Sequence, residues 1–91
     1  MYKTLIFRVH AIQRMAQRGI SVDDVRQALD TGEIVEDYPN DFPYPSALVL
    51  GWIEQRPLHI VTATAPEKRI IITVYEPDPA RWKPGFTRRK L

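Results

Sequence analysis

The spacing of the apolar residues changes at Gly32, and this change constrains the fold more than any other feature of the sequence. Before Gly32, apolar side chains recur every three to four residues, as in helices. After it, they form uninterrupted runs of strand length that are rich in β-branched residues. The pattern predicts an α+β protein in which two helices precede a sheet. A chain of 91 residues is expected to form one domain, so residues 1–91 are predicted to be a single unit.

Two short helices are predicted, one over residues 9–18 and one beginning after Ser21. Gly19 ends the first helix, and Gly32 fits the stop of the second. Ser21 is suited to cap the second helix, with Asp24 three residues later as its capping-box partner. Helical spacing predicts a buried stripe on each helix, formed by Ala11, Ile12, Met15 and Ala16 and by Val22, Val25, Ala28 and Leu29.

Four strands are predicted downstream of the helices, over residues 34–38, 46–53, 58–65 and 70–76. The last three are joined by connections short enough for hairpins, and a loop with three prolines precedes them. We therefore expect an α+β fold with a two-helix hairpin packed on a four-stranded, mainly antiparallel sheet. The expected core is Met15, Val25, Leu29, Leu48, Leu50, Ile60, Val61, Ile71 and Val74.

Basic residues are concentrated at the end of the chain. Residues 81–91, here called the basic tail, hold five bases and no acid, whereas residues 1–80 hold eight bases and eleven acids. Basic side chains displace counterions from a polyanion and aromatic rings stack on bases, so the tail is predicted to bind RNA. The alternative is a tail that solubilises the protein or packs its aromatic rings on the body. The residues assigned to RNA binding are Arg81, Trp82, Lys83, Arg88 and Arg89.

An acidic region formed by Glu36, Asp37 and Asp41 could meet these charges. It could fold back on the basic tail of the same chain, or it could receive a basic partner. Both interpretations fit the sequence.

The cluster of side chains that most clearly suggests a function consists of His10, Arg14 and Arg18. They recur at every fourth residue, which places them along one face of the first predicted helix. An imidazole that titrates near neutrality could transfer a proton, while the guanidinium groups hold a phosphate and offset developing charge. These residue types suit phosphodiester chemistry. The alternative is a solvated helix face with a structural histidine.

His59 and Tyr75 lie on predicted strands. His59 shares a face with Val61 and Ala63, opposite Ile60, and is expected to be half-buried and bonded to a local acceptor. It could instead pair with His10 across the interface between sheet and helices. Tyr75, at a strand end, could stack on a base or donate to a phosphate, or it could be a packed residue with a solvated hydroxyl.

Several other kinds of chemistry lack support. The chain has no cysteine, and neither histidine lies beside a carboxylate at ligand spacing, so no metal or other cofactor is predicted. There is no P-loop and no G-x-S-x-G motif. The apolar run Leu5–Phe7 is too short for a signal peptide or a membrane span, so we expect a cytoplasmic protein with no membrane contact.

Several segments together resemble a known family. HAIQRMAQRGIS, GEIVEDYP, DFPYPSALVLG, RPLHIVTA and ITVYEPDPARW look like the DUF4258 family of small prokaryotic proteins, over nearly the whole chain. More distantly, the chain resembles the RelE/BrnT-like toxins, in which helices cover one face of a small antiparallel sheet.

The resemblance implies the toxin of a type II toxin–antitoxin system, a metal-independent endoribonuclease that inhibits translation by cleaving mRNA. His10 would then be the acid or base, Arg14 and Arg18 would hold the phosphate, and Tyr75 would assist. The implied partners are a cognate antitoxin, which would be a small zinc-finger or helix-turn-helix protein, together with mRNA and the ribosome. The alternatives are a module that binds RNA or protein without catalysis, and a toxin-derived domain that has lost its activity.

Overall fold

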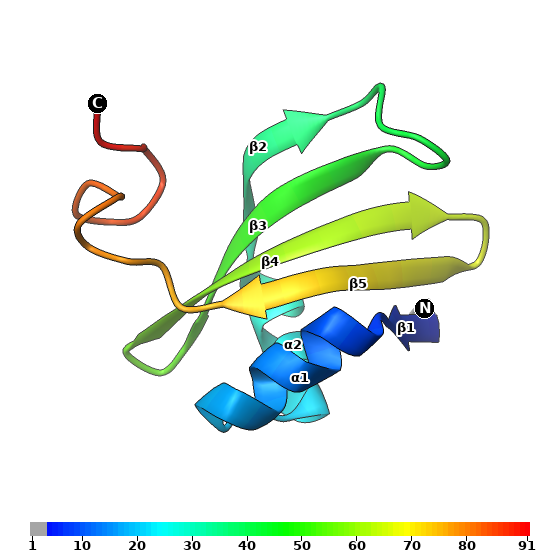
Figure 1. Ribbon diagram of the computed structural model, residues 1–91, viewed down its shortest axis with the longest axis horizontal. Helices are drawn as coiled ribbons and strands as arrows, with labels where there is room; N and C mark the ends of the chain where they lie inside the picture. Colours follow the sequence, from blue (N-terminus) through cyan, green and yellow to red (C-terminus); the bar gives the residue numbers. More distant parts are fainter. Residues whose placement is uncertain (1–3) are drawn as a thin grey trace.

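The computed structural model describes residues 4–91, which form two helices and five strands (Figure 1). In chain order these are β1 (Thr4–Phe7), α1 (Val9–Arg18), α2 (Val22–Thr31), β2 (Glu33–Tyr38), β3 (Ser46–Ile53), β4 (Arg56–Ala65) and β5 (Lys68–Tyr75). The predicted helices and the four predicted strands all occur, with shifts of at most two residues at their ends.

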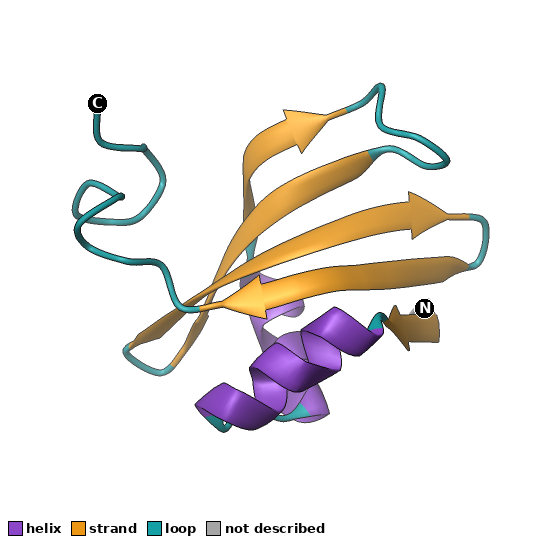
Figure 2. Ribbon diagram, in the orientation of Figure 1, coloured by secondary structure: helices purple, strands orange, loops and turns teal. Residues whose placement is uncertain are grey.

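The sheet has five strands in the order β1-β5-β4-β3-β2, and it is mixed because one of its four pairings is parallel and the other three are antiparallel. Strands β2 to β5 pair antiparallel as a meander, and both helices lie on one face of the sheet (Figure 2). Strand β1 pairs parallel to β5, with Phe7 opposite Ile71. The prediction of four strands was therefore wrong by one edge strand.

Strand β1 was not predicted because four residues are too few to show the alternation of apolar and polar side chains that identifies a strand. Its partner β5 lies more than sixty residues away in the sequence, so no hairpin turn between the two strands indicates that they pair. The chain passes from β1 directly into α1, which packs against β5 and carries β1 to the same strand. Docking of the helix therefore places β1.

The helix ends show which local signals were reliable. Gly19 adopts the left-handed conformation at φ 64°, and Ser21 and Asp24 form the expected capping box. Gly32 follows α2 but is extended at φ −75°, so it is not a left-handed stop. Gly51 of β3 allows close packing of α2, because a Cβ atom there would lie 2.2 Å from the carbonyl oxygen of Ala28.

The main core lies between the helices and the sheet. Its fully buried members come from both layers and are mostly aliphatic, including Val25, Leu58, Ile60, Ile71 and Val74. Of the residues predicted for the core, Leu29 and Val61 are only partly buried, and the others are buried. The predicted buried stripes of both helices were too wide. In α1, Ala11 and Met15 are buried, whereas Ile12 and Ala16 are exposed. In α2, Val22 is exposed.

A bulge in β5 divides its side chains between the two faces of the sheet. Val61 pairs with Thr73 and Thr62 pairs with Ile71, so Ile72 is an extra residue on β5. Ile71 and Val74 can therefore both join the helix-side core, although they are three residues apart. Tyr75, paired with His59, is directed to the opposite face.

The chain after β5 crosses to that opposite face (Figure 1). Asp78 accepts a hydrogen bond from the amide of Ala80 and begins a turn. The basic tail then doubles back on itself, with Trp82 bridged to Arg89. The helices thus cover one face of the sheet, and part of the other face is covered by the tail.

Candidate functional site

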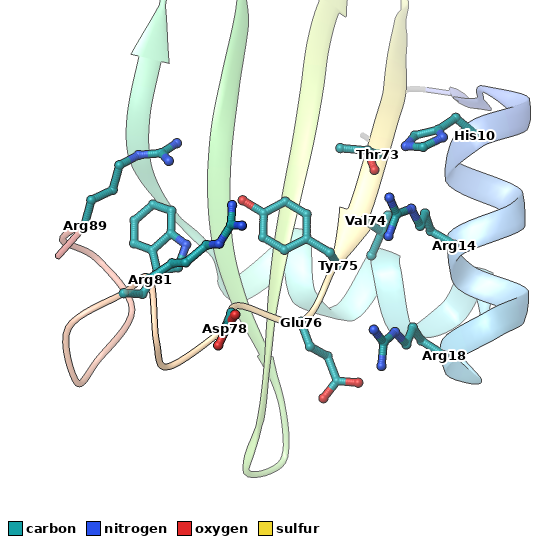
Figure 3. A pocket seen from close by; sticks show the side chains of 11 residues that line it. His10, Arg14, Arg18, Thr73, Val74, Tyr75, Glu76, Asp78, Arg81 and Arg89 are labelled. Carbon is teal, nitrogen blue, oxygen red and sulfur yellow. The ribbon is translucent and has the colours of Figure 1, made fainter. Parts of the chain in front are cut away.

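A groove of about 560 Å³ lies between α1, the end of β5 and the basic tail (Figure 3). Helix α1 forms one wall, the tail forms the other, and the last residues of β5 lie between them. Strand β1 pairs with β5 only as far as Ile71. Beyond that point, beside Thr73 and Tyr75, no strand of the described chain pairs with β5 on this side, so the end of β5 is an edge of the sheet. The residues that line the groove are His10, Arg14, Arg18, Thr73, Val74, Tyr75, Glu76, Asp78, Arg81, Trp82 and Arg89.

The α1 wall presents three basic side chains in a row. His10, Arg14 and Arg18 are all exposed and point toward β5 (Figure 3). The neighbouring carboxylate of Glu76 accepts a hydrogen bond from Arg56 at 2.8 Å, and Arg56 also donates to the carbonyl oxygen of Arg18. Glu76 is therefore already paired with a cation. Neither ion pair found among residues 4–91 involves the guanidinium groups of α1.

On the floor of the groove, Tyr75 is tied to the buried His59. The Nε2 atom of His59 lies 2.8 Å from the carbonyl oxygen of Phe86, and Nδ1 lies 3.2 Å from the hydroxyl of Tyr75. A carbonyl only accepts, so Nε2 carries the hydrogen and Nδ1 of the neutral ring accepts from the tyrosine. Burial lowers the pKa of His59, which favours this neutral form, and burial also raises the pKa of Tyr75. Tyr75 can offer a ligand its oxygen as an acceptor.

In the tail wall, Trp82 and Arg89 are held by the rest of the protein. Trp82 is 4% exposed. Its ring packs edge-to-face against that of His59, with 4.4 Å between the ring centroids. The guanidinium group of Arg89 lies over the Trp82 ring, 4.7 Å from the ring centroid. Arg89 donates to both carboxylate oxygens of Glu36, at 2.7 and 3.0 Å. The hydrogen bonds from Arg89 and Tyr38 lower the pKa of Glu36 to about 2.

These contacts decide two alternatives that the sequence left open. The acidic region does fold back on the basic tail, but through Glu36, while Asp41 accepts from the hydroxyl of Ser46. The ring of Trp82 packs on the body of the protein and is enclosed by His59 and Arg89.

The structure brings most of the predicted site residues together. His10, Arg14, Arg18 and Tyr75 line the groove, as do three members of the basic tail, Arg81, Trp82 and Arg89. Lys83 and Arg88 are exposed but lie outside it. The groove unites residues that are more than sixty positions apart in the sequence.

The expectation that His59 is half-buried was wrong, because the residue is fully buried. Its ring does bond to an acceptor, the carbonyl oxygen of Phe86, and also to Tyr75, so the alternative pairing with His10 does not occur. His59 lies on the sheet face opposite the helices, which separates it from α1. The strand alternation predicted that His59 shares a face with Val61 and Ala63, but the enclosure of His59 depends on Trp82 and Phe86, which no local pattern connects to it.

The DUF4258 family, described as a domain of unknown function, matches residues 7–76, about three quarters of the chain. The chain belongs to the DUF4258 family. The matched part of this DUF4258 protein includes His10, Arg14, Arg18 and Tyr75, and it ends before the basic tail. No curated protein and no solved structure matches the chain.

The groove of this DUF4258 protein is suited to an anionic ligand. Its bases outnumber its two carboxylates, and one of these, Glu76, is already paired with Arg56. Among residues 4–91 no group of three His, Asp or Glu side chains is arranged to hold a metal ion. No helix in the described part of the chain is long and apolar enough to cross a membrane.

Proposed function

We propose that this DUF4258 protein binds single-stranded RNA in the groove and cleaves it without a metal ion. The observation that carries the proposal is the convergence of Arg14, Arg18 and Arg81 on the end of β5. Two of them come from α1 and the third from the basic tail, and none takes part in an ion pair among residues 4–91. Charges left unpaired around one cavity favour an anion with several negative groups, such as a phosphodiester chain.

The chemistry would use the ribose as its own nucleophile. The 2′ oxygen attacks the adjacent phosphorus, the bond from phosphorus to the 5′ oxygen breaks, and the products are a cyclic phosphate and a 5′ hydroxyl. Arg14 and Arg18 would hold the phosphate and stabilise the charge that builds up on it. His10 would take the proton from the 2′ hydroxyl as that oxygen attacks and would give it to the 5′ oxygen as it leaves. The oxygen of Tyr75 would accept a hydrogen bond from the ribose and orient it.

The biological setting that we propose is the toxin half of a type II toxin–antitoxin pair that inhibits translation. The support is the resemblance of the sequence to RelE/BrnT-like toxins. A small zinc-finger or helix-turn-helix antitoxin would cover the groove with an acidic segment, since opposite charges speed association. Messenger RNA, at the ribosome or free, would be the substrate.

A module that binds RNA without cutting it is the second candidate. The observation in its favour is the small number of groups that could move a proton. Within the described residues of the groove, Glu76 is paired with Arg56, Asp78 accepts a hydrogen bond from the amide of Ala80, and the hydroxyl hydrogen of Tyr75 is directed to His59. His10 is therefore the residue on which catalysis depends.

Replacement of His10 by alanine tests the proposal. If His10 exchanges the proton, the variant should cleave RNA about 10²–10⁴-fold more slowly at saturating RNA. The fold should survive, because His10 is exposed on α1. Cleavage is measured on purified RNA, and in cells by growth after induction and by primer extension on total RNA.

Arg14→Lys is the matched control, because lysine keeps the charge and loses the two-pronged guanidinium geometry, so cleavage should still fall. A folded His10→Ala protein that cleaves RNA and arrests growth like the wild type would exclude the catalytic role. If the wild type and the His10→Ala variant both bind RNA and neither of them cleaves it, the protein is a module that binds RNA without cutting it. A lowered melting temperature with unchanged cleavage would make His10 a structural residue.

A further inference from the structure

The basic tail is a small hairpin with two different faces. Trp82 and Arg89 are direct cross-strand neighbours, and the flanking amides of Lys83 and Lys90 each donate to a carbonyl oxygen across the hairpin, those of Arg88 and Arg81, at 2.8 Å. One face of this hairpin therefore carries Trp82 and Arg89, which pack on His59 and pair with Glu36.

The other face of the hairpin carries only basic side chains. Side chains alternate along a strand, so the residues on either side of Trp82 and Arg89 leave the backbone on the opposite side from them, although the side chain of Arg81 then reaches into the groove toward Tyr75 (Figure 3). These residues are Arg81, Lys83, Arg88 and Lys90, and all are exposed. No ion pair among residues 4–91 involves any of them. We call these four residues the outer face of the hairpin.

The arrangement of the outer face is unfavourable for the hairpin by itself. The register places Arg81 opposite Lys90 and Lys83 opposite Arg88, and like charges directly across a hairpin destabilise it. The ion pair of Arg89 lies on the opposite face and does not relieve this repulsion. A bound polyanion would relieve it.

We propose that the outer face binds the sugar–phosphate backbone of the RNA strand where the strand leaves the groove. This inference rests on the proposed function, because it extends the same RNA site. Arg81 belongs both to the outer face and to the lining of the groove, so the two basic surfaces are continuous. A groove of about 560 Å³ holds only a short part of an RNA strand, and the strand has to continue outside it.

Aromatic residues at the turn of the hairpin favour a nucleic acid over an acidic peptide. Phe86 is partly exposed at the turn, and its ring lies 6.2 Å from that of Trp52, which is 40% exposed. Bases stack on such rings without sequence preference, whereas basic side chains beside them hold the phosphates. The path that we propose therefore runs from α1 past Arg81 to the hairpin turn.

The test compares two double variants that each remove one lysine and one arginine. Lys83→Gln with Arg88→Gln neutralises the outer face, and Arg26→Gln with Lys68→Gln removes the same charge from exposed positions elsewhere. The probes are a 2′-O-methyl dinucleotide, which fits the groove alone, and a 2′-O-methyl dodecanucleotide. Both probes resist cleavage by 2′ oxygen attack, so only binding is measured, over a range of salt concentrations.

The outer-face variant should bind the dodecanucleotide more weakly, and its slope of log affinity against log salt should become shallower by about 1.4. The control variant should keep the wild-type slope, and all three proteins should bind the dinucleotide alike. The outer-face variant should also melt no lower than the wild type, because a repulsive pair has been removed. A lower melting temperature, or an unchanged slope, would overturn the inference.

The outcomes separate this inference from the proposed function. If the wild type binds neither probe, both fail. If the dinucleotide binds and Arg14→Gln weakens it, while the outer-face variant binds the dodecanucleotide like the wild type, only the hairpin surface is wrong. If the wild type binds polyglutamate but not the dodecanucleotide, and the outer-face variant loses this binding, the outer face binds an acidic protein and the RNA path is overturned.

Discussion

The two faces of the sheet are covered by different kinds of contact. On the helix side, α1 and α2 pack aliphatic residues such as Val25, Ile60 and Val74 against one another. On the other side, leucines of β3 underlie a polar and aromatic network in which His59 bonds to Tyr75 and Trp82 lies against Arg89. The first covering depends on apolar area alone, whereas the second combines buried apolar residues, among them Leu50 opposite His59, with hydrogen bonds and charges that have defined partners.

The difference indicates how the stability of the fold and the candidate site are divided between the two faces of the sheet. Apolar burial has no preferred direction and varies little with pH or salt, so the helix side is suited to hold the fold. A network of titratable and charged groups responds to both, and three of its members, Tyr75, Trp82 and Arg89, line the groove. The tail side should therefore loosen under conditions that leave the helix side intact.

The largest effect is expected from truncation on the helix side. Ile60→Ala should lower the free energy of unfolding by about 2–5 kcal/mol, because Ile60 is fully buried and its loss leaves a cavity. Trp82→Ala should cost less than half as much, although tryptophan is larger, since the basic tail can detach without unfolding the sheet. Urea unfolding measures both. Equal costs would mean that the tail belongs to the same cooperative core.

A smaller effect is expected from pH, and it should arise on the tail side. The pKa of His59 lies below its ordinary value of 6.5 in the folded protein because the ring is buried. As the pH falls below 6.5, the unfolded chain takes up a proton that the folded chain does not, so stability falls, by at most about 1.4 kcal/mol per pH unit. The melting temperature should decrease over this window.

His59→Gln should remove most of that dependence, and His10→Gln, on the helix side, should leave it in place. The charged groups that face His59 are Glu36 and Arg89, and Tyr75 is its titratable hydrogen-bond partner. Glu36, Arg89 and Tyr75 are present in both variants, so their contribution to the pH dependence of stability is the same in both. If the two variants show the same pH dependence, the buried ring is not its source.

The smallest effect is expected for the ion pair at the edge of the tail. Glu36→Gln should cost about 0.2–1 kcal/mol near neutral pH, because the Arg89 side chain is 60% exposed and water screens the pair. The pKa of Glu36 is lowered from 4.5 to about 2, so the pair contributes fully above pH 4.5 and is lost as the pH falls toward 2. Thermal melts of wild type and variant should converge in acid. A difference that persists at pH 2 would exclude the ion pair as its cause.

The helices and the meander could be predicted because their signals are local. The capping box of Ser21 and Asp24 involves residues three apart, and residues 46–53 form a strand with the predicted limits. The row formed by His10, Arg14 and Arg18 follows from helical spacing alone. The mistakes were at β1 and at the widths of the helix stripes, where the outcome depends on how α1 packs against β5.

The candidate site was only half predictable. The sequence indicated its residue types and the α1 row, and it also indicated a tail rich in charge. It carried no signal that Arg81 would face that row across the end of β5, or that Phe86 would bond to His59. The bulge at Ile72, which turns Tyr75 away from the helices, was not predicted either.

The sequence by itself determined the order and kind of the main elements, the capping of α2 and the charge of the tail, because these depend on neighbours a few residues apart. The tertiary structure alone decided the parallel edge strand, the enclosure of His59 and the two-faced tail hairpin over the sheet. Each of these joins residues that are far apart in the chain or that have no periodic pattern. Such contacts form only when burial and hydrogen bonding across the whole fold repay the entropy lost in bringing them together.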